Sequence, residues 1–318
     1  MNNFNYITFD EIKNLDISPK ECVDWAEFVI KNKRNWELPP KISIHFGNEC
    51  FFNTMPSLIS ELDMFGLKVV SRLPERTPAL KADIFLYSVK TGNLVCAMDG
   101  TWITTMRTGA VAAITANGLQ KSRNRDYSFV GLGNTARASL LCLDAILNHE
   151  EITVKLLAYK NQHELFMERF KNFHNIHFEV FSDTDEFMRS STVIFSCITA
   201  ATSLFSDEKN YKDGVLIIPV QTRGFQNCDL VFDRIYCDDI PHIAGFKNFS
   251  LYKNVVEMTD VLLENAIMGR GRKNDNERLI AYNIGISLQD VYFASKIFNK
   301  ISGTEENGYK EELSKFWV

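Results

Sequence analysis

The chain has 318 residues and a formal net charge of −5, with 45% hydrophobic and 24% charged residues. A chain of this length and composition suggests about two globular domains that bury their cores without a disulfide or metal staple. The mildly acidic balance gives no electrostatic footprint for nucleic acid or an anionic membrane, so we expect neither as a partner.

The seven cysteines form no C-x-x-C pair, and several lie within apolar runs. Free thiols buried in a reducing compartment explain this usage, and the six histidines lack ligand spacing, so we expect no metal site. The amino-terminal segment has neither the basic nor the apolar region of a signal peptide. No apolar run approaches the roughly 18 residues that cross a bilayer. The sequence therefore predicts a cytoplasmic protein.

The first hundred or so residues have the pattern of an α+β domain. A short strand precedes an amphipathic helix, with Ser18 as its N-cap and Pro19 as its first residue. Apolar runs with β-branched residues predict strands at 41–46 and 67–73, and the strands "ADIFLYSV" and "LVCAMDG" join through the turn "KTGN". We expect an antiparallel meander with flanking helices.

The character of the chain changes near residue 104. The stretch "TTMRTGAVAAITANGLQK" predicts a helix of small residues that packs closely against a neighbour. Beyond the polar link "SRNRD", short apolar strands alternate with helices, which is typical of a doubly wound parallel sheet. Near residue 285 this pattern gives way to an amphipathic helix. The strands that we expect are 127–131, 152–159, 193–198, 215–220 and 231–237.

The segment "FVGLGNTA" ends the first of these strands and opens the next helix. It fits G-x-G-x-x-[G/A], in which Gly131 permits the tight turn, Gly133 lets a pyrophosphate approach, and Ala136 allows close helix packing. The helix N-terminus would supply free N–H groups and a positive dipole end. A merely structural corner is the alternative. We predict that a dinucleotide binds at Gly131, Gly133, Asn134, Thr135 and Ala136.

The end of the second strand bears on the choice of dinucleotide. NAD-binding folds usually carry an acidic residue there, which bonds the ribose 2′-hydroxyl. Here Lys160 and Asn161 follow the strand, and no carboxylate occurs before Glu164. Because a cation suits a 2′-phosphate, we predict NADP or NAD as the cofactor, with NADP favoured. An ordinary solvated lysine at position 160 is the alternative.

Several motifs, taken in their order along the chain, resemble the ornithine cyclodeaminase/mu-crystallin family. The helix "TTMRTGAVAA" stands shortly before the glycine turn, as the family's RTAA helix does. The likeness covers roughly residues 35 to 300. It also rests on "GLKVVSRLPE", "DGTWITTMRT", "VIFSCITAA", "VLIIPVQTRGFQNCDL" and "GRGRKNDNERLIAYNIGISLQD".

The resemblance implies an α/β fold in which a Rossmann-type doubly wound parallel sheet is inserted into an α+β substrate-binding and dimerisation domain. Residues 122–285 would form the Rossmann domain, and residues 1–121 with 286–318 the other, within a homodimer. It implies an NAD(P)-dependent oxidoreductase acting on the C–N bond of a small amino or imino acid, as a ketimine reductase or opine-like amino-acid dehydrogenase. The alternatives are a cyclodeaminase that releases ammonia from ornithine or lysine, and a non-catalytic NADPH-binding protein like mu-crystallin.

Three cations match residues that handle the substrate in this family. Arg107 matches the arginine that grips the carboxylate, which a guanidinium meets with two parallel hydrogen bonds. Lys68 matches the lysine beside the reacting nitrogen, where burial near Arg107 would lower its pKa and let it donate a proton. Lys41 falls where the family usually has an arginine as a second carboxylate contact, and lysine keeps only the charge. A surface role is the alternative for each.

Other matches to the family lie around the cofactor, at Thr199, Val220 and Gly285.

The most informative departure from the family pattern is Arg223. Cyclodeaminases carry an aspartate in a pattern like G-D-x-P-G-K-x-E-L, and aligning its glutamate with Asp229 places Arg223 at the aspartate's position. A cation there would repel a substrate ammonium, which argues against cyclodeaminase activity. We expect Arg223 to bind a second substrate carboxylate, or else the cofactor phosphates.

Overall fold

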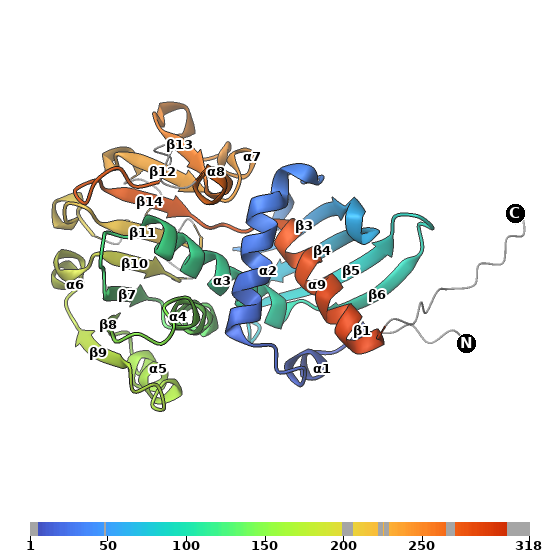
Figure 1. Ribbon diagram of the computed structural model, residues 1–318, viewed down its shortest axis with the longest axis horizontal. Helices are drawn as coiled ribbons and strands as arrows, with labels where there is room; N and C mark the ends of the chain where they lie inside the picture. Colours follow the sequence, from blue (N-terminus) through green and yellow to red (C-terminus); the bar gives the residue numbers. More distant parts are fainter. Residues whose placement is uncertain are drawn as a thin grey trace, which may run out of the picture. The chain divides into compact units, whose positions relative to one another are not determined.

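The computed structural model describes residues 6–47, 49–198, 206–221, 225, 229–264 and 271–303 (Figure 1). Contacts within the chain divide it into two units. The second unit comprises Ile17–Arg34 and Thr105–Ile286. The domain division that the family resemblance implies has a boundary after residue 121, whereas the contacts group the helix from Thr105 onward with the second unit. The first unit comprises Met1–Asp16, Asn35–Thr104 and Ser287–Val318.

The first unit is a six-stranded sheet crossed on one face by a long helix. Its elements are β1 (Tyr6–Ile7), α1 (Phe9–Lys13), β2 (Ile42–Phe46), β3 (Cys50–Ile59), η2 (Ser60–Leu62), β4 (Met64–Arg72), β5 (Leu80–Ser88), β6 (Leu94–Asp99) and α9 (Ser287–Ser302). The strand order is β1-β6-β5-β4-β3-β2, antiparallel from β2 to β6. The predicted meander and its β5–β6 hairpin are therefore confirmed. β3 was not predicted, because Pro56 interrupts its apolar pattern.

The two faces of this sheet differ in burial. Helix α9 packs on β3, β4 and β5 (Figure 1). Gly66 of β4 leaves room for it, since a Cβ there would lie 2.2 Å from Cγ2 of Val291 in α9. The opposite face exposes Ile44 and its cross-strand partner Phe52. The core of the unit thus lies between α9 and one face of the sheet.

The second unit is built on eight strands. Its elements are α2 (Pro19–Asn32), η1 (Lys33–Asn35), α3 (Thr101–Leu119), β7 (Asp126–Val130), α4 (Asn134–Ile146), β8 (Ile152–Leu157), α5 (Gln162–Arg169), β9 (Ile176–Phe181), α6 (Thr184–Ser190), β10 (Val193–Ser196), η3 (Glu208–Asn210), β11 (Leu216–Pro219), η4 (Asp229–Val231), β12 (Arg234–Cys237), α7 (Ile240–Ile243), η5 (Phe249–Leu251), β13 (Val255–Glu257), α8 (Met258–Glu264) and β14 (Leu279–Tyr282). Helix α3 begins in the first unit and η1 ends in it.

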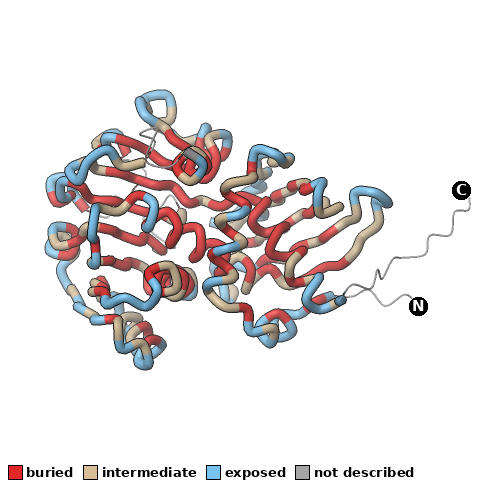
Figure 2. The backbone as a smooth tube through the Cα atoms, viewed as in Figure 1, coloured by how far each residue is buried: buried red, intermediate tan, exposed pale blue. Residues whose placement is uncertain are grey.

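All strand pairs of this sheet are parallel, in the order β13-β12-β14-β11-β10-β7-β8-β9. The chain winds outward from β7 in both directions, so the strand order reverses between β7 and β10, where such folds bind ligands. The five predicted strands correspond to β7, β8, β10, β11 and β12, and the Rossmann-type fold is confirmed. β10, β11, β12 and β14 are buried along their whole length, as Figure 2 shows for the interior of the unit.

The helices of the second unit follow their sequence signals. The predicted N-cap of α2 is present, since the Ser18 hydroxyl accepts a hydrogen bond from the Glu21 amide and the Glu21 carboxylate bonds back. The small-residue helix α3 approaches α4 closely, because a Cβ on Gly109 would lie 2.5 Å from the carbonyl carbon of Ala138. Across the described ranges, no helix combines the length and hydropathy needed to cross a membrane.

Candidate active site

The predicted glycine turn joins the carboxyl end of β7 to α4. Gly131 has a φ of +79°, and a Cβ there would lie 2.5 Å from the carbonyl carbon of Cys197, which follows β10. Only glycine fits both constraints. Gly133 is the N-cap of α4, makes no side-chain cap, and has no described atom within 4 Å of an added Cβ apart from its own chain neighbours. Gly131 therefore serves the corner itself, while Gly133 leaves the helix N-terminus open.

The first turn of α4 presents polar groups beside this opening. Asn134 is exposed and Thr135 is half-buried, whereas Ala136 is buried against the interior, as the motif requires. Arg137 is exposed in the same turn and was not predicted. Free helix amides, the helix dipole and a guanidinium together suit a phosphate. The residues present thus fit the pyrophosphate of a dinucleotide.

The loop after β8 holds the residues that would meet the adenosine ribose. Lys160 adopts the left-handed region with a φ of +50°, and its Nζ lies 5.4 Å from the ring centroid of Tyr159. Both side chains are exposed. On the other side of the switch point, the half-buried Val220 follows β11 and donates its N–H to the Ser196 carbonyl at 3.1 Å. Thr199 and Arg223 lie outside the described residues.

Arg107 and Gly285, which were predicted separately, are in contact. Arg107 projects from α3 and is only 5% exposed, so it is not an ordinary surface arginine. Gly285 follows β14 with a φ of +85°, and a Cβ there would lie 2.2 Å from Nη1 of Arg107. The guanidinium therefore lies directly against the Gly285 backbone. A side chain at position 285 would be strained and would also displace the arginine.

Asp238 is a buried residue of this site that the sequence did not single out. Its carboxylate accepts hydrogen bonds from the Gly285 amide at 2.8 Å and from Nδ2 of Asn283 at 2.9 Å. Burial raises the pKa of Asp238, and those two hydrogen bonds and the positive charges of Arg107 and Lys33 oppose the rise. The only sequence signal was the acidic pair that follows the apolar strand in "IYCDD".

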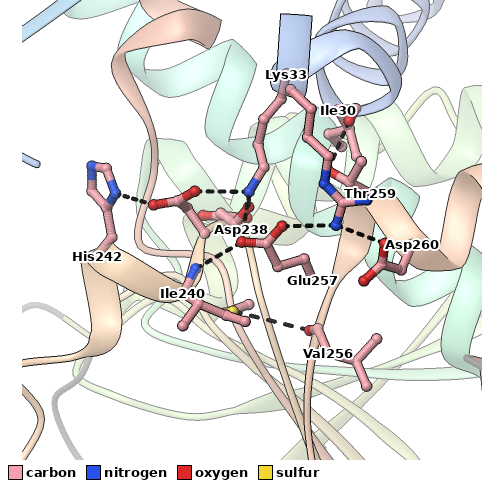
Figure 3. A network of polar contacts seen from close by, with 12 residues as sticks. Ile30, Lys33, Asp238, Ile240, His242, Val256, Glu257, Thr259 and Asp260 are labelled. Carbon is pink, nitrogen blue, oxygen red and sulfur yellow. Dashed lines mark hydrogen bonds and ion pairs between the residues drawn. The ribbon is translucent and has the colours of Figure 1, made fainter. Parts of the chain in front are cut away.

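Lys33 ties the residues after β12 to the end of α2 (Figure 3). Its Nζ donates to the Asp238 backbone oxygen at 2.7 Å and to Oδ1 of Asp239 at 2.8 Å, and lies 3.0 Å from Oε1 of Glu257. His242 adds a contact of 2.7 Å between Nδ1 and Oδ2 of Asp239. Burial alone would raise the pKa of Asp239, but the His242 and Lys33 contacts outweigh it and lower that pKa.

Two buried polar atoms at the carboxyl edge of the sheet have no hydrogen-bond partner among the described residues. They are Oδ1 of Asn283, directly after β14, and Oγ of Ser196, the last residue of β10. Buried polar atoms are rarely left unpaired in native proteins, and a bound ligand is one way to satisfy them. Their position at the strand ends agrees with a cofactor lying along this edge.

In the first unit, Lys68 of β4 pairs with a carboxylate of α9. Its Nζ lies 2.9 Å from Oδ2 of Asp290, and the two residues are 1% and 0% exposed. Asp290 was not predicted, and its carboxylate lies directly against the lysine nitrogen. Lys41 is half-buried and directly precedes β2. Lys41 and Lys68 thus belong to the first unit, and Arg107 and the glycine turn to the second.

Asp229, which aligns with the glutamate of the cyclodeaminase pattern, anchors the structure. It is 1% exposed, and its carboxylate accepts hydrogen bonds from Nδ2 of Asn248 at 3.0 Å and from the Tyr282 hydroxyl at 3.0 Å. The hydroxyl of Tyr252 donates to the same carboxylate. These neutral donors join η4 to β14 and to the segment around η5.

Comparisons with known proteins identify a family for this chain. Residues 10–305 match the model of the ornithine cyclodeaminase/mu-crystallin family. A Δ1-pyrroline-2-carboxylate reductase of Bacillus cereus is 26% identical over 320 residues, which cover 92% of this chain and 95% of the relative.

Two solved structures share the fold. The Δ1-pyrroline-2-carboxylate reductase of Thermococcus litoralis, in complex with NADH and L-proline, superposes with a TM-score of 0.78 at 20% identity, covering 93% of this chain and 98% of that one. An archaeal alanine dehydrogenase dimer with bound NAD gives a TM-score of 0.79 at 21% identity, covering 96% and 99%.

Proposed function

The chain belongs to the ornithine cyclodeaminase/mu-crystallin family, and from this premise we propose that it is an NAD(P)-dependent oxidoreductase that reduces a C=N bond next to a carboxylate, or oxidises the corresponding amino acid. The observation that carries the proposal is the buried guanidinium of Arg107 against Gly285, in the same unit as the open helix N-terminus at Gly133. One Rossmann-type unit thus offers a site for a carboxylate and a site for a diphosphate.

Arg107 would bind the substrate carboxylate. Its planar fork makes two parallel hydrogen bonds to a carboxylate, and its contact with Gly285 restricts the directions in which the fork can point. Fixing the carboxylate fixes the neighbouring α-carbon, which is how a positioned substrate loses less entropy in the reaction. Lys41 would add a second, weaker contact by charge alone.

Lys68 would hold a proton for the substrate nitrogen. The Asp290 carboxylate at 2.9 Å fixes the orientation of the buried lysine side chain. A reduced nicotinamide, when bound, supplies hydride to the carbon of the C=N bond. The nitrogen then takes up a proton, which Lys68 can donate and recover from solvent. In the direction of amino-acid oxidation, the neutral lysine would accept that proton.

The cofactor would lie along the carboxyl edge of the eight-stranded sheet. The amides at Asn134 and Thr135 suit the phosphates, with Arg137 as an added cation. Lys160 favours NADP, since its ammonium suits a 2′-phosphate and the end of β8 offers no carboxylate for a ribose hydroxyl. NAD is the alternative, and the two solved relatives above contain NADH and NAD.

Δ1-Pyrroline-2-carboxylate is the first substrate to test, because the Bacillus cereus relative is a reductase of that compound. Arg223 motivates a second class, imines that carry an extra carboxylate, as formed from an amino acid and a 2-oxo acid. The lack of a carboxylate between residues 214 and 228 argues against ammonia release from ornithine or lysine.

The sheet face of the first unit that lies opposite α9 supports a homodimer. Ile42 and Ile44 of the edge strand β2 are each 63% exposed, and the adjacent Phe52 is 42% exposed. Apolar side chains gathered on one sheet face commonly mark a protein interface, and the archaeal alanine dehydrogenase is a dimer. We expect Ile44→Lys to shift the mass measured by light scattering from dimer to monomer.

The test of the function is NADPH and NADH oxidation with Δ1-pyrroline-2-carboxylate and a panel of amine and 2-oxo-acid pairs. Arg107→Met should lower kcat/KM by about 100-fold or more, since it removes a bidentate charged contact. Arg125→Met is the matched control, because Arg125 pairs with Glu150 at the surface of the same unit. Saturable NADPH binding without consumption would instead support a binding protein. Ammonia release from ornithine would support a cyclodeaminase.

A further inference from the structure

A buried carboxylate joins the ends of two neighbouring strands beside Arg107. Asp238, directly after β12, accepts hydrogen bonds from the Gly285 amide at 2.8 Å and from Nδ2 of Asn283 at 2.9 Å. Its own amide donates to the Tyr282 carbonyl at 3.3 Å. The main chain of Asp238 is therefore bonded to the end of β14, and its side chain is bonded to the segment that follows β14.

Gly285 transmits this constraint to Arg107. An added Cβ at Gly285 would lie 2.2 Å from Nη1 and 2.8 Å from Nη2 of the guanidinium, so the two groups are already in contact. A shift of the Gly285 backbone toward the arginine must displace the guanidinium, because packed atoms cannot interpenetrate. The bond from the Gly285 amide to Asp238 opposes such a shift.

Asp238 is itself held firmly. It is 8% exposed, and Nζ of Lys33 donates to its backbone oxygen at 2.7 Å. Lys33 in turn pairs with Asp239 and with Glu257, and Figure 3 labels Lys33 and Glu257. The backbone of Asp238 is thus held by Lys33 at the end of α2, and its carboxylate is held by donors that follow β14.

We propose that Asp238 is a positioning residue for the reaction: acting through the Gly285 backbone, its carboxylate fixes the Arg107 guanidinium in the orientation that binds the substrate carboxylate. This inference rests on the proposed function of Arg107. A carboxylate suits the role because each of its two oxygens accepts one of the two donors. An amide at this position would accept one bond and direct its NH₂ group at the other donor.

The test compares Asp238→Asn with Asp239→Asn. Asparagine is isosteric and cheaper to bury than a charge, so both variants should fold. Binding of pyrrole-2-carboxylate, a planar carboxylate analogue, is measured by calorimetry, so that the readout does not require turnover. We expect Asp238→Asn to weaken this binding and to raise the KM for Δ1-pyrroline-2-carboxylate, each by about 10- to 100-fold, with the Kd of NADPH nearly unchanged.

Asp239→Asn is the matched control. Asp239 is equally buried and contacts Lys33 and His242 in the same network. It should lower the melting temperature without changing the Kd of the analogue. Equal loss of analogue binding in both variants, or unchanged binding in Asp238→Asn, would overturn the inference. If Asp238→Asn does not fold, Asp238→Glu is compared with Asp239→Glu, and wild-type binding by Asp238→Glu would count against it.

A double-mutant cycle separates this role from a general structural one. If Asp238 acts through the guanidinium, Asp238→Asn should change analogue binding by less than about two-fold in an Arg107→Lys background. Full additivity would overturn the inference. Analogue binding by a wild-type protein that turns over no imine would refute the proposed function while the comparison still decides the role of Asp238. Failure of the wild-type protein to bind any carboxylate would refute both.

Discussion

The glycine turn offers a direct test of whether it is a phosphate site or only a corner. Gly131 and Gly133 stand two positions apart in one motif, yet their surroundings differ. A Cβ at Gly131 would lie 2.5 Å from the Cys197 backbone, whereas described atoms leave open space beside Gly133. The substitution Gly131→Ala should therefore lower mainly the stability, whereas Gly133→Ala should weaken mainly cofactor binding.

The expected magnitudes follow from these surroundings. At Gly131, a left-handed φ costs an alanine about 1–2 kcal/mol, and the overlap with a backbone atom adds about 1–3 kcal/mol. The total of about 2–5 kcal/mol should lower the melting temperature by about 5–15 °C. At Gly133, the poorer N-cap costs about 0.5–1 kcal/mol. The lower entropy of the unfolded chain returns about 0.4–1 kcal/mol, so the stability should barely change.

Cofactor binding, unlike stability, should be sensitive to the substitution at Gly133. A methyl group in the open space would push a pyrophosphate away from the helix amides, and each lost charge-assisted bond is worth about 1.5–3 kcal/mol. We expect the Kd of NADPH, measured by fluorescence titration, to rise about 10- to 100-fold in Gly133→Ala. If Gly133→Ala keeps the wild-type Kd and melting temperature, the turn is only a corner and the dinucleotide site lies elsewhere.

Three further predictions concern single residues. Lys160→Ala should weaken NADPH binding by about 10-fold and leave NADH binding unchanged, since one exposed charge pair with the 2′-phosphate is lost; a parallel loss for both cofactors would contradict the assignment. Asp290→Asn should lower the free energy of unfolding by about 3–5 kcal/mol in a urea titration, because it leaves the buried Lys68 charge without its carboxylate. An unaltered midpoint would disprove that pairing. Burial raises the pKa of Cys96 and of Cys197 to about 12, so both thiols should resist alkylation at pH 8 until the protein is denatured, as checked by mass spectrometry. Rapid labelling of the native protein would contradict their burial.

Features encoded over short stretches of chain were the ones that the sequence predicted well. The Ser18 cap and the strand–turn–helix around Gly131 are set by neighbours along the chain, and both are present. The family resemblance predicted Arg107 and Gly285 as site residues, but it did not predict that the two are in contact. β3 escaped prediction because Pro56 masks its alternation, although the strand keeps pairs on both sides.

The charged partners of the site could not be predicted, for a physical reason. Lys68 and Asp290 are 222 residues apart in the chain, and Asp238 and Gly285 are 47 apart. Such pairs form only after the sheets and helices have assembled, so no local pattern encodes them. The sequence shows which side chains are chemically able to act, but their partners emerge from the tertiary fold.

The glycine at position 109 determines how closely two helices of the second unit pack. Gly109 lies two residues beyond Arg107 on α3, and its backbone meets α4 at Ala138, one turn after the helix begins. The spacing between the guanidinium and the amides of the glycine turn is thus set by the direct touch of two main chains. Rigid peptide groups, rather than adjustable side chains, set this distance. Even one added methyl group at position 109 would therefore push α3 away from α4 and increase the distance between the Arg107 guanidinium and the glycine turn.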